Sequence, residues 1–227
     1  MSKTAAVIKG DGVGPELVDA MIKVTEAANT DVEFIMCKAG AGWWEKHGGN
    51  SLIPDETWDI LDSADACFKG PTTTPGGVGT PRSVAVSIRQ KYNLYANVRP
   101  VKTFPNTNPP LGEVDFACVR EGTEGLYIGE EVKLTDDVYI AIRKITRTSS
   151  NNIARYSFEE AKKRNYDTVV PIHKSNILKL TCGTFLEEVN KVSAEYPDID
   201  TWEYHIDNIA QQLIKNPQIF NNKILLS

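Results

Sequence analysis

The first hundred residues alternate short apolar runs with amphipathic segments, and this alternation limits the possible folds more than any other feature of the chain. Apolar runs at residues 5–9, 32–37 and 66–68 have the length and composition of strands. Between them, apolar side chains recur at helical spacing over residues 15–28, and a Pro-Asp-Glu sequence at 54–56 opens a second helix. Strands separated by helices favour a parallel sheet with helical crossovers. The sequence therefore predicts an α/β protein.

The second half contains a strand of a different kind. Val138, Ile140 and Ile142 alternate with less apolar neighbours, which is typical of a half-exposed antiparallel strand. Ser149-Ser150-Asn151 offers N-cap candidates for the helix that follows. The remaining apolar patterns predict strands at 94–98, 114–119, 168–172 and 201–205, and helices at 149–164, 177–196 and 206–215.

A change in composition marks the expected domain boundary. Residues 102–110 are rich in Pro, Asn and Thr, which is typical of a linker. We therefore expect residues 1–98 to form the N-terminal part of a large α/β domain and residues 99–215 to form a small domain with dimer contacts. Residues 216–227 are expected to begin the return to the large domain. The chain stops within the apolar segment Ile224–Ser227, which predicts a truncated chain with an exposed, aggregation-prone strand edge.

Charge and cysteine usage exclude several classes of function. Twenty-five basic and thirty acidic side chains give a net charge of −5, which disfavours binding to nucleic acid. The chain has no apolar run long enough to span a membrane, and Met1–Thr4 is too short and too weakly flanked to begin a signal peptide. Four widely spaced cysteines without a C-x-x-C pair favour reduced thiols in a cytoplasmic protein over disulfides or a metal site.

The segment Gly10–Glu16, with the sequence GDGVGPE, forms the turn from the first strand to the first helix. It partly matches a dinucleotide fingerprint, but Pro15 and Glu16 replace the expected third glycine. A tight structural turn is at least as good an interpretation as a nucleotide site. The N-terminus of the helix also remains able to approach an anionic ligand.

A second segment combines a Gly/Pro/Thr loop at 69–81 with a predicted helix at 82–89. Arg82 and Arg89 lie seven residues apart and are expected to share one helical face. Arg99 and Arg120 each follow an apolar strand. A single arginine is usually a solvated surface residue, but several arginines at strand ends favour bidentate binding of carboxylates. The predicted ligand is a small polycarboxylate.

A third segment, His173–Asn176, follows the predicted strand at 168–172. Lys174 is placed to act as a general acid or base if burial and cationic neighbours lower its pKa; the alternative is a solvent-exposed lysine. His173 is interpreted as a structural histidine, because His47 and His205 make no metal-ligand spacing with it.

Taken together and in order, these segments resemble the β-decarboxylating dehydrogenases, the family of isocitrate, 3-isopropylmalate and homoisocitrate dehydrogenases. The resemblance implies a two-domain fold whose large domain is incomplete here. It also implies oxidation of a 2-hydroxy acid by NAD or NADP, followed by loss of the β-carboxylate, with Mg²⁺ or Mn²⁺ as a cofactor. The matching segments are residues 10–16, 69–75, 82–100, 120–131, 145–164, 173–179 and the stretch around Asp207.

The resemblance also implies roles for individual residues. Arg89, Arg99 and Arg120 match the substrate-binding arginines, Tyr127 the residue that protonates the enol, and Lys174 the residue that takes the hydroxyl proton. These assignments place the chain among the enzymes of the tricarboxylic acid cycle if the substrate is isocitrate.

Other matched positions concern the cofactors and the partner subunit. Thr73 and Thr74 match the loop that meets the nicotinamide, and Asp207 matches a metal ligand. In such enzymes Lys174, Asn176 and Asp207 reach the site of the other subunit, so a homodimer with shared active sites is expected. Two further metal-binding aspartates and an H-G-S-A-P loop would follow Ile224 in the family pattern, which predicts that residues 1–227 alone are inactive.

The choice of substrate depends on the segment 82–89. Ser83 matches the serine that binds the third carboxylate of isocitrate, whereas Ala85 stands where many isocitrate enzymes have asparagine. Val84 and Val86 add apolar surface that is typical of isopropylmalate enzymes. We favour isocitrate, with 3-isopropylmalate or homoisocitrate as alternatives. A non-catalytic subunit or fragment is the competing hypothesis from a different class.

Overall fold

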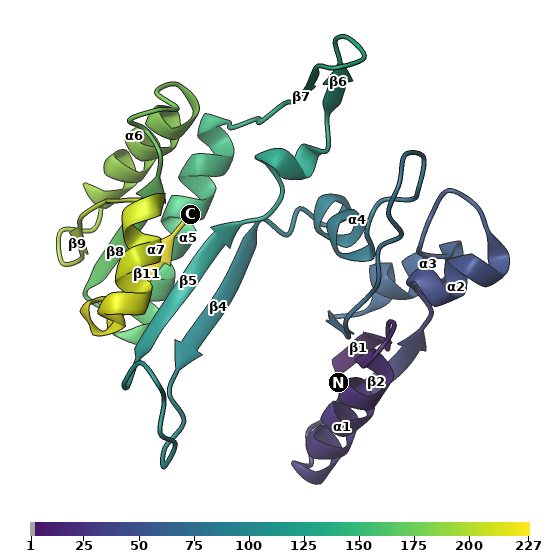
Figure 1. Cartoon of the computed structure of the whole chain (residues 1–227). Coiled ribbons are helices and arrows are strands. Elements are labelled where there is room, and N and C mark those ends of the chain that lie inside the picture. Colours follow the sequence, from purple (N-terminus) through teal and green to yellow (C-terminus); the bar gives the residue numbers. More distant parts are fainter. Residues whose placement is uncertain (1–2) are drawn as a thin grey trace. The chain divides into compact units, whose positions relative to one another are not determined.

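The computed structural model describes residues 3–227. The prediction that the chain has no signal peptide concerned Met1–Thr4, and Met1 and Ser2 lie outside the described residues. The chain divides into two compact units, residues 1–91 and 92–227, which are described separately (Figure 1). The prediction of an α/β protein is confirmed in both. Within residues 3–227, none of the helices is long and apolar enough to cross a lipid bilayer.

The first unit is built on a three-stranded parallel sheet with the order β2-β1-β3. The central strand is buried on both faces from Ala5 to Ile8, as expected for a parallel strand with helices on its faces. The elements of this unit are β1 (Lys3–Ile8), α1 (Gly14–Ala27), β2 (Val32–Cys37), α2 (Ala41–His47), α3 (Asp55–Ser63), β3 (Ala66–Lys69) and α4 (Val84–Lys91).

The second unit contains a six-stranded sheet with the order β10-β8-β11-β5-β4, and β9 also pairs with β8. All neighbours in it are parallel except β4 and β5, which are antiparallel. The elements are β4 (Ala96–Lys102), β5 (Asp115–Glu121), η1 (Leu126–Ile128), β6 (Glu131–Lys133), β7 (Tyr139–Ala141), α5 (Arg147–Arg164), β8 (Thr168–His173), α6 (Thr181–Ser193), β9 (Asp200–Thr201), β10 (Tyr204–His205), α7 (Ile206–Lys215), η2 (Pro217–Phe220) and β11 (Lys223–Leu226).

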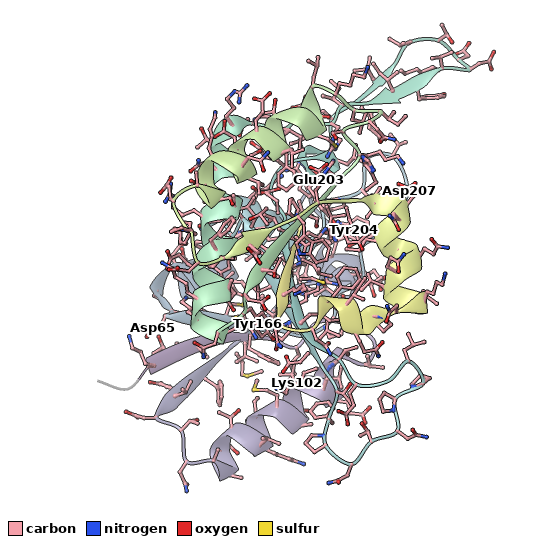
Figure 2. All side chains as sticks on the ribbon, turned by 90° about the vertical axis from the view of Figure 1, so that its left-hand side faces the viewer. Asp65, Lys102, Tyr166, Glu203, Tyr204 and Asp207 are labelled. Carbon is pink, nitrogen blue, oxygen red and sulfur yellow. The ribbon has the colours of Figure 1, made fainter. Side chains whose placement is uncertain are left out.

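Each face of this sheet has its own apolar core. Because side chains alternate along a strand, Val169 faces α5 and α6, whereas its neighbour Val170 faces α7 and η2. Phe158 of α5 is fully buried in the first core, and Ile209 of α7 is buried in the second. Figure 2, whose ribbon has the colours of Figure 1, shows the green helices α5 and α6 on one side of the strands and the yellow helix α7 on the other. This three-layer arrangement places the ends of β5 and β8 beside the loops that carry the candidate site.

The domain boundaries differ from the predicted ones. The division falls after Lys91, so the predicted boundary between residues 98 and 99 lies inside β4. Residues 102–110 are not an interdomain linker; they belong to the connection between β4 and β5, which form one antiparallel ladder within the second unit. Proline and asparagine suit such a connection as well as they suit a linker.

The last strand corrects a second expectation. β11 does not begin a return to the first unit, and it is not an exposed edge. It lies between β5 and β8, and residues Ile224–Leu226 are almost completely buried. The predicted aggregation at this edge therefore has no structural basis, because both sides of the strand are already paired.

Two local features refine the sequence predictions. The strand predicted around Ile140 is antiparallel, as expected, but it forms an isolated hairpin of β6 and β7 whose residues are all exposed. Helix α5 begins earlier than predicted, because Thr146 is its N-cap: Thr146 Oγ1 accepts a hydrogen bond from the Ser149 backbone N–H at 3.2 Å.

Candidate active site

Lys174 and Asp207 meet in the second unit. Lys174 follows β8, and Asp207 lies in the first turn of α7, which continues directly from β10; Figure 2 labels Asp207 at this end of the helix. The Lys174 Nζ atom lies 2.6 Å from a carboxylate oxygen of Asp207. This hydrogen bond and the backbone N–H of Asp207 itself lower the pKa of the Asp207 carboxyl group. The neighbour of Lys174 is therefore an anion, whereas the predicted role of Lys174 as a general acid or base required cationic neighbours.

The backbone around Lys174 is held from two sides. The Lys174 N–H donates to Cys182 Sγ at 3.4 Å, and the Ser175 N–H donates to His173 Nδ1 at 3.2 Å. Burial lowers the pKa of His173, and the Glu203 carboxylate opposes this effect from 3.4 Å. His173 is thus a buried histidine that shapes the loop, consistent with its structural interpretation. Asn176 lies exposed in the same loop.

Arg120 and Tyr127 form a second contact of the candidate site. Arg120 is the penultimate residue of β5 and donates a 2.5 Å hydrogen bond to Tyr127 Oη, and its guanidinium carbon lies 5.1 Å from the centre of the tyrosine ring. The intervening glutamates fix this geometry. The Glu121 carboxylate accepts the N–H groups of the turn that follows it, and Glu124 accepts the N–H and hydroxyl of Thr146 at the start of α5. These glutamates therefore position the turn.

The strand register brings Arg99 and Arg120 together. Arg99 pairs with Cys118 and Asn97 pairs with Arg120 across the β4–β5 ladder, so the two arginines lie diagonally on one face. Such diagonal neighbours are about 7–8 Å apart at their Cα atoms, within reach of one small ligand for arginine side chains. Arg99 also donates from Nε to Asn97 at 3.4 Å.

A cavity of about 500 Å³ in the second unit includes Arg120 and Tyr127 in its wall. Arg143 also lines it, and the sequence analysis did not single out this residue. Arg143 donates to Thr181 Oγ1 at 2.8 Å and approaches Cys182 Sγ at 3.5 Å. Arg143 lies on the exposed connection after β7, and its partners lie in α6, far along the chain. No local sequence pattern therefore indicated that it lines the cavity.

In the first unit, Arg89 lies on α4, and Ser83 immediately precedes this helix. The helix begins at Val84, so Arg82 precedes it and does not share its face with Arg89; Arg82 bonds to Gln90 instead. Ser83 Oγ accepts the Val86 N–H at 3.2 Å and so caps the first turn of α4. Arg89 is half-buried.

Lys69 ends the strand that precedes the threonine loop. Burial and the neighbouring Arg89 guanidinium lower the pKa of Lys69. Its Nζ donates to the Gly70 carbonyl at 2.7 Å. Lys69 therefore lies close to Arg89 within the first unit, at the start of the loop that leads to Thr73 and Thr74.

The loop of Thr73 and Thr74 follows β3, and both residues are exposed. It runs close to the Gly10–Glu16 segment: a Cβ atom on Gly10 would lie 1.9 Å from the Pro71 carbonyl oxygen. Gly10 is therefore needed for the packing of two loops of the protein itself. This observation favours the tight structural turn over a dinucleotide fingerprint at Gly10.

The described residues do not by themselves form a metal site. Among residues 3–227, no group of three or more His, Cys, Asp or Glu side chains is arranged to hold a metal ion. Asp207, the predicted metal ligand, instead pairs with Lys174. The structure thus groups Arg99 with Arg120 and Tyr127, and Lys174 with Asp207, while Ser83, Arg89, Thr73 and Thr74 belong to the other unit.

Comparison with known proteins gives a consistent family. The family model of isocitrate/isopropylmalate dehydrogenase matches residues 4–226. The chain is 37% identical over 220 residues to 3-isopropylmalate dehydrogenase from Methanothermobacter thermautotrophicus, covering 96% of this chain and 64% of that protein. It is 39% identical over 220 residues to the NADP isocitrate dehydrogenase of Thermus thermophilus, covering 96% and 44%.

The fold comparison agrees with these sequences. The crystal structure of isocitrate dehydrogenase from Methylococcus capsulatus matches with a TM-score of 0.91 and 40% identity, covering 99% of this chain and 66% of that one. The chain thus spans from under half to about two thirds of the length of the relatives it matches. Because the family model covers nearly every residue, the chain belongs to the isocitrate/isopropylmalate dehydrogenase family.

Proposed function

We propose that this chain, within a catalytically complete protein, oxidises and decarboxylates isocitrate to 2-oxoglutarate with NAD or NADP and a divalent metal, Mg²⁺ or Mn²⁺. The main support is the contact between Arg120 and Tyr127, with Arg99 on the same face of the sheet. This arrangement places two carboxylate-binding forks beside a hydroxyl group that is able to donate a proton.

The roles of the chain's own residues follow from this arrangement. Arg99 and Arg120 bind and orient the carboxylates of the substrate, which reduces the entropy lost on reaching the transition state. Lys174, in its neutral form, accepts the proton of the 2-hydroxyl group. A bound dinucleotide would take the hydride from the carbon that carries this hydroxyl. After carbon dioxide leaves, Tyr127 donates its proton to the carbon of the resulting enol.

Ser83 favours isocitrate as the substrate. Its oxygen accepts the Val86 N–H, so the hydroxyl hydrogen remains available to donate to the third carboxylate of isocitrate. Val84, which the sequence analysis counted as apolar surface for a substrate, is fully buried in the protein. 3-Isopropylmalate or homoisocitrate is the alternative substrate, because the isocitrate and 3-isopropylmalate enzymes are similarly related to the chain and Val86 remains partly accessible.

The experiment needs a form of the chain with a full set of active-site residues. We define the completed chain as residues 1–226 joined to the part of the Methylococcus capsulatus enzyme that follows the matched region. The completed chain is expected to reduce NAD or NADP in the presence of isocitrate and Mg²⁺ or Mn²⁺. A well-folded completed chain without turnover of any of the three acids would favour the non-catalytic alternative.

Replacing Ser83 with leucine in the completed chain is expected to lower kcat/KM for isocitrate by about ten- to a hundredfold. A lost hydrogen bond to a charged group costs about 1.5–3 kcal/mol, and each 1.4 kcal/mol is about tenfold. The matched control is Ser83→Thr, which keeps the hydroxyl group. Steady-state kinetics with isocitrate and 3-isopropylmalate measure the effect; a parent enzyme that prefers 3-isopropylmalate contradicts the assignment.

Residues 1–227 without the added segment are expected to give no turnover with either dinucleotide, whatever divalent metal is supplied. Asp207 is one carboxylate, and Mg²⁺ bound by one carboxylate keeps most of its hydration shell. The measurement is the absorbance of the reduced nicotinamide with isocitrate present. Turnover clearly above background would show that Asp207 and its neighbours suffice.

A second copy of the chain is the proposed partner. Ile177 and Leu180, close to Lys174 in the sequence, are largely exposed, as is Ile206 at the start of α7. The β6–β7 hairpin also exposes Leu134 and Ile140. Such apolar side chains suit an interface between copies, and a homodimer would bring Lys174, Asn176 and Asp207 to the site of the partner.

A further inference from the structure

The carboxylate of Asp11 joins three loops at one edge of the first sheet. Asp11 follows the central strand β1, and the loops after β2 and β3 lie on either side. Its oxygens accept the N–H groups of Ala41 at 3.0 Å, Gly42 at 2.9 Å and Thr73 at 2.8 Å. One side chain therefore fixes the start of α2 and the loop that leads to Thr74.

The backbone of Asp11 adds a fourth bond to the same loop. The Asp11 N–H donates to the Pro71 carbonyl at 2.8 Å, so residues 71 and 73 are both held by Asp11. Hydrogen bonds to an ionised carboxylate are shorter and stronger than those between neutral groups. One residue of the GDGVGPE segment therefore holds the loop at two points, Pro71 and Thr73.

Glycine at position 40 is required by this arrangement. Gly40 has a φ of +114°, and a Cβ atom there would lie 2.3 Å from an Asp11 carboxylate oxygen. The carboxylate thus occupies the space that a side chain at position 40 would fill. This close approach gives an independent way to disturb Asp11 without changing its charge.

From these contacts we infer that Asp11 is a positioning residue for the cofactor loop: it fixes the backbone at Thr73 so that Thr73 and Thr74 present their hydroxyl groups to the nicotinamide end of the dinucleotide. The inference rests on the proposed function. Because the Thr73 N–H is used by Asp11, the loop meets the cofactor through side-chain hydroxyls and carbonyls, and not through that N–H. The GDGVGPE segment then serves the cofactor indirectly, through the loop that it holds.

The first experiment measures amide hydrogen exchange in the 227-residue chain. In Asp11→Asn, one carboxylate oxygen becomes an NH₂ group and the other becomes a neutral, weaker acceptor, so the Thr73 and Ala41 amides are expected to exchange at least about tenfold faster. The matched control is Asp59→Asn, an exposed aspartate on α3 with the same change of charge. Unchanged exchange at Thr73 in Asp11→Asn overturns the inference.

A second pair of variants covers the possibility that Asp11→Asn fails to fold. Gly40→Ala is expected to accelerate exchange at Thr73 in the same way, because its new Cβ displaces the Asp11 carboxylate. Gly48→Ala is the control: Gly48 also has a positive φ, of +70°, but no atom lies within 4 Å of its would-be Cβ. Equal exchange at Thr73 in these two variants counts against the inference.

Kinetics of the completed chain distinguish positioning from a merely structural role. Asp11→Asn and Gly40→Ala are expected to raise the KM for the dinucleotide by about ten- to a hundredfold while the KM for isocitrate changes by less than about threefold. Faster exchange at Thr73 with an unchanged dinucleotide KM overturns the link to the cofactor. A parent completed chain without dinucleotide-dependent turnover overturns the proposed function, and the exchange data then still decide whether Asp11 holds the loop.

Discussion

Lys174→Met in the completed chain is expected to lower kcat by about 10²–10⁴-fold, the usual contribution of a positioned general acid or base. Methionine keeps much of the length of the side chain but cannot accept the proton of the substrate hydroxyl. The matched control is Lys179→Met, five residues further along, where the lysine is exposed. Steady-state kinetics at saturating isocitrate measure the loss.

The effect on KM separates this role from a structural one. Lys174 also pairs with Asp207, so its removal leaves that carboxylate without its 2.6 Å partner. An isocitrate KM that rises with kcat unchanged would assign Lys174 to binding alone. A variant that retains more than about a tenth of the parent kcat would contradict the proposed proton transfer.

Phe158→Ala is expected to give the largest loss of stability among single substitutions in the second unit. Phe158 is fully buried between α5 and the sheet, and its ring stacks on Tyr196 at 5.0 Å between centroids. Truncation of a buried phenylalanine lowers the free energy of unfolding by about 3–5 kcal/mol, because it removes buried apolar contacts and leaves a cavity.

Urea denaturation of the 227-residue chain, followed by circular dichroism, tests this prediction. Phe104→Ala is the matched control, since Phe104 is 78% exposed in the β4–β5 connection and its truncation is expected to cost about 0.5 kcal/mol or less. Similar losses for the two variants would show that α5 does not depend on Phe158 for its packing.

Local sequence patterns were sufficient for most of the helices and strands. β2 and α7 have the predicted bounds, because each has a clear apolar period and a polar or glycine boundary. α2 was not predicted: it has seven residues, begins after a glycine with positive φ, and lacks a side-chain cap of its own. Asp11, thirty residues earlier, bonds to its first N–H groups instead. No local pattern contains that contact.

The candidate site shows the same limit. Arginines near predicted strand ends and a lysine after a strand were visible in the sequence. Arg99, however, lies inside β4 and does not follow a strand, and the face that it shares with Arg120 depends on the β4–β5 register. The linker interpretation of residues 102–110 was wrong for a related reason. A composition rich in Pro, Asn and Thr indicates a turn or loop, but it does not show whether that loop joins two paired strands, such as β4 and β5, or two domains. The contribution of Arg143 to the cavity wall also depends on tertiary contacts alone.

The place of β11 has a consequence for the order of events during synthesis. The strand enters the middle of its sheet, between β5 and β8, after α5, α6 and α7 have been made. Until residues 223–226 leave the ribosome, β5 and β8 each lack the neighbouring strand with which they pair in the native sheet. The apolar side chains that β11 covers have no native partner during this time. Pairing over such a long separation is slow, and exposed edges favour misassembly meanwhile. The three described strands of the first unit, in contrast, have all been made by Lys69, long before β11 is synthesised.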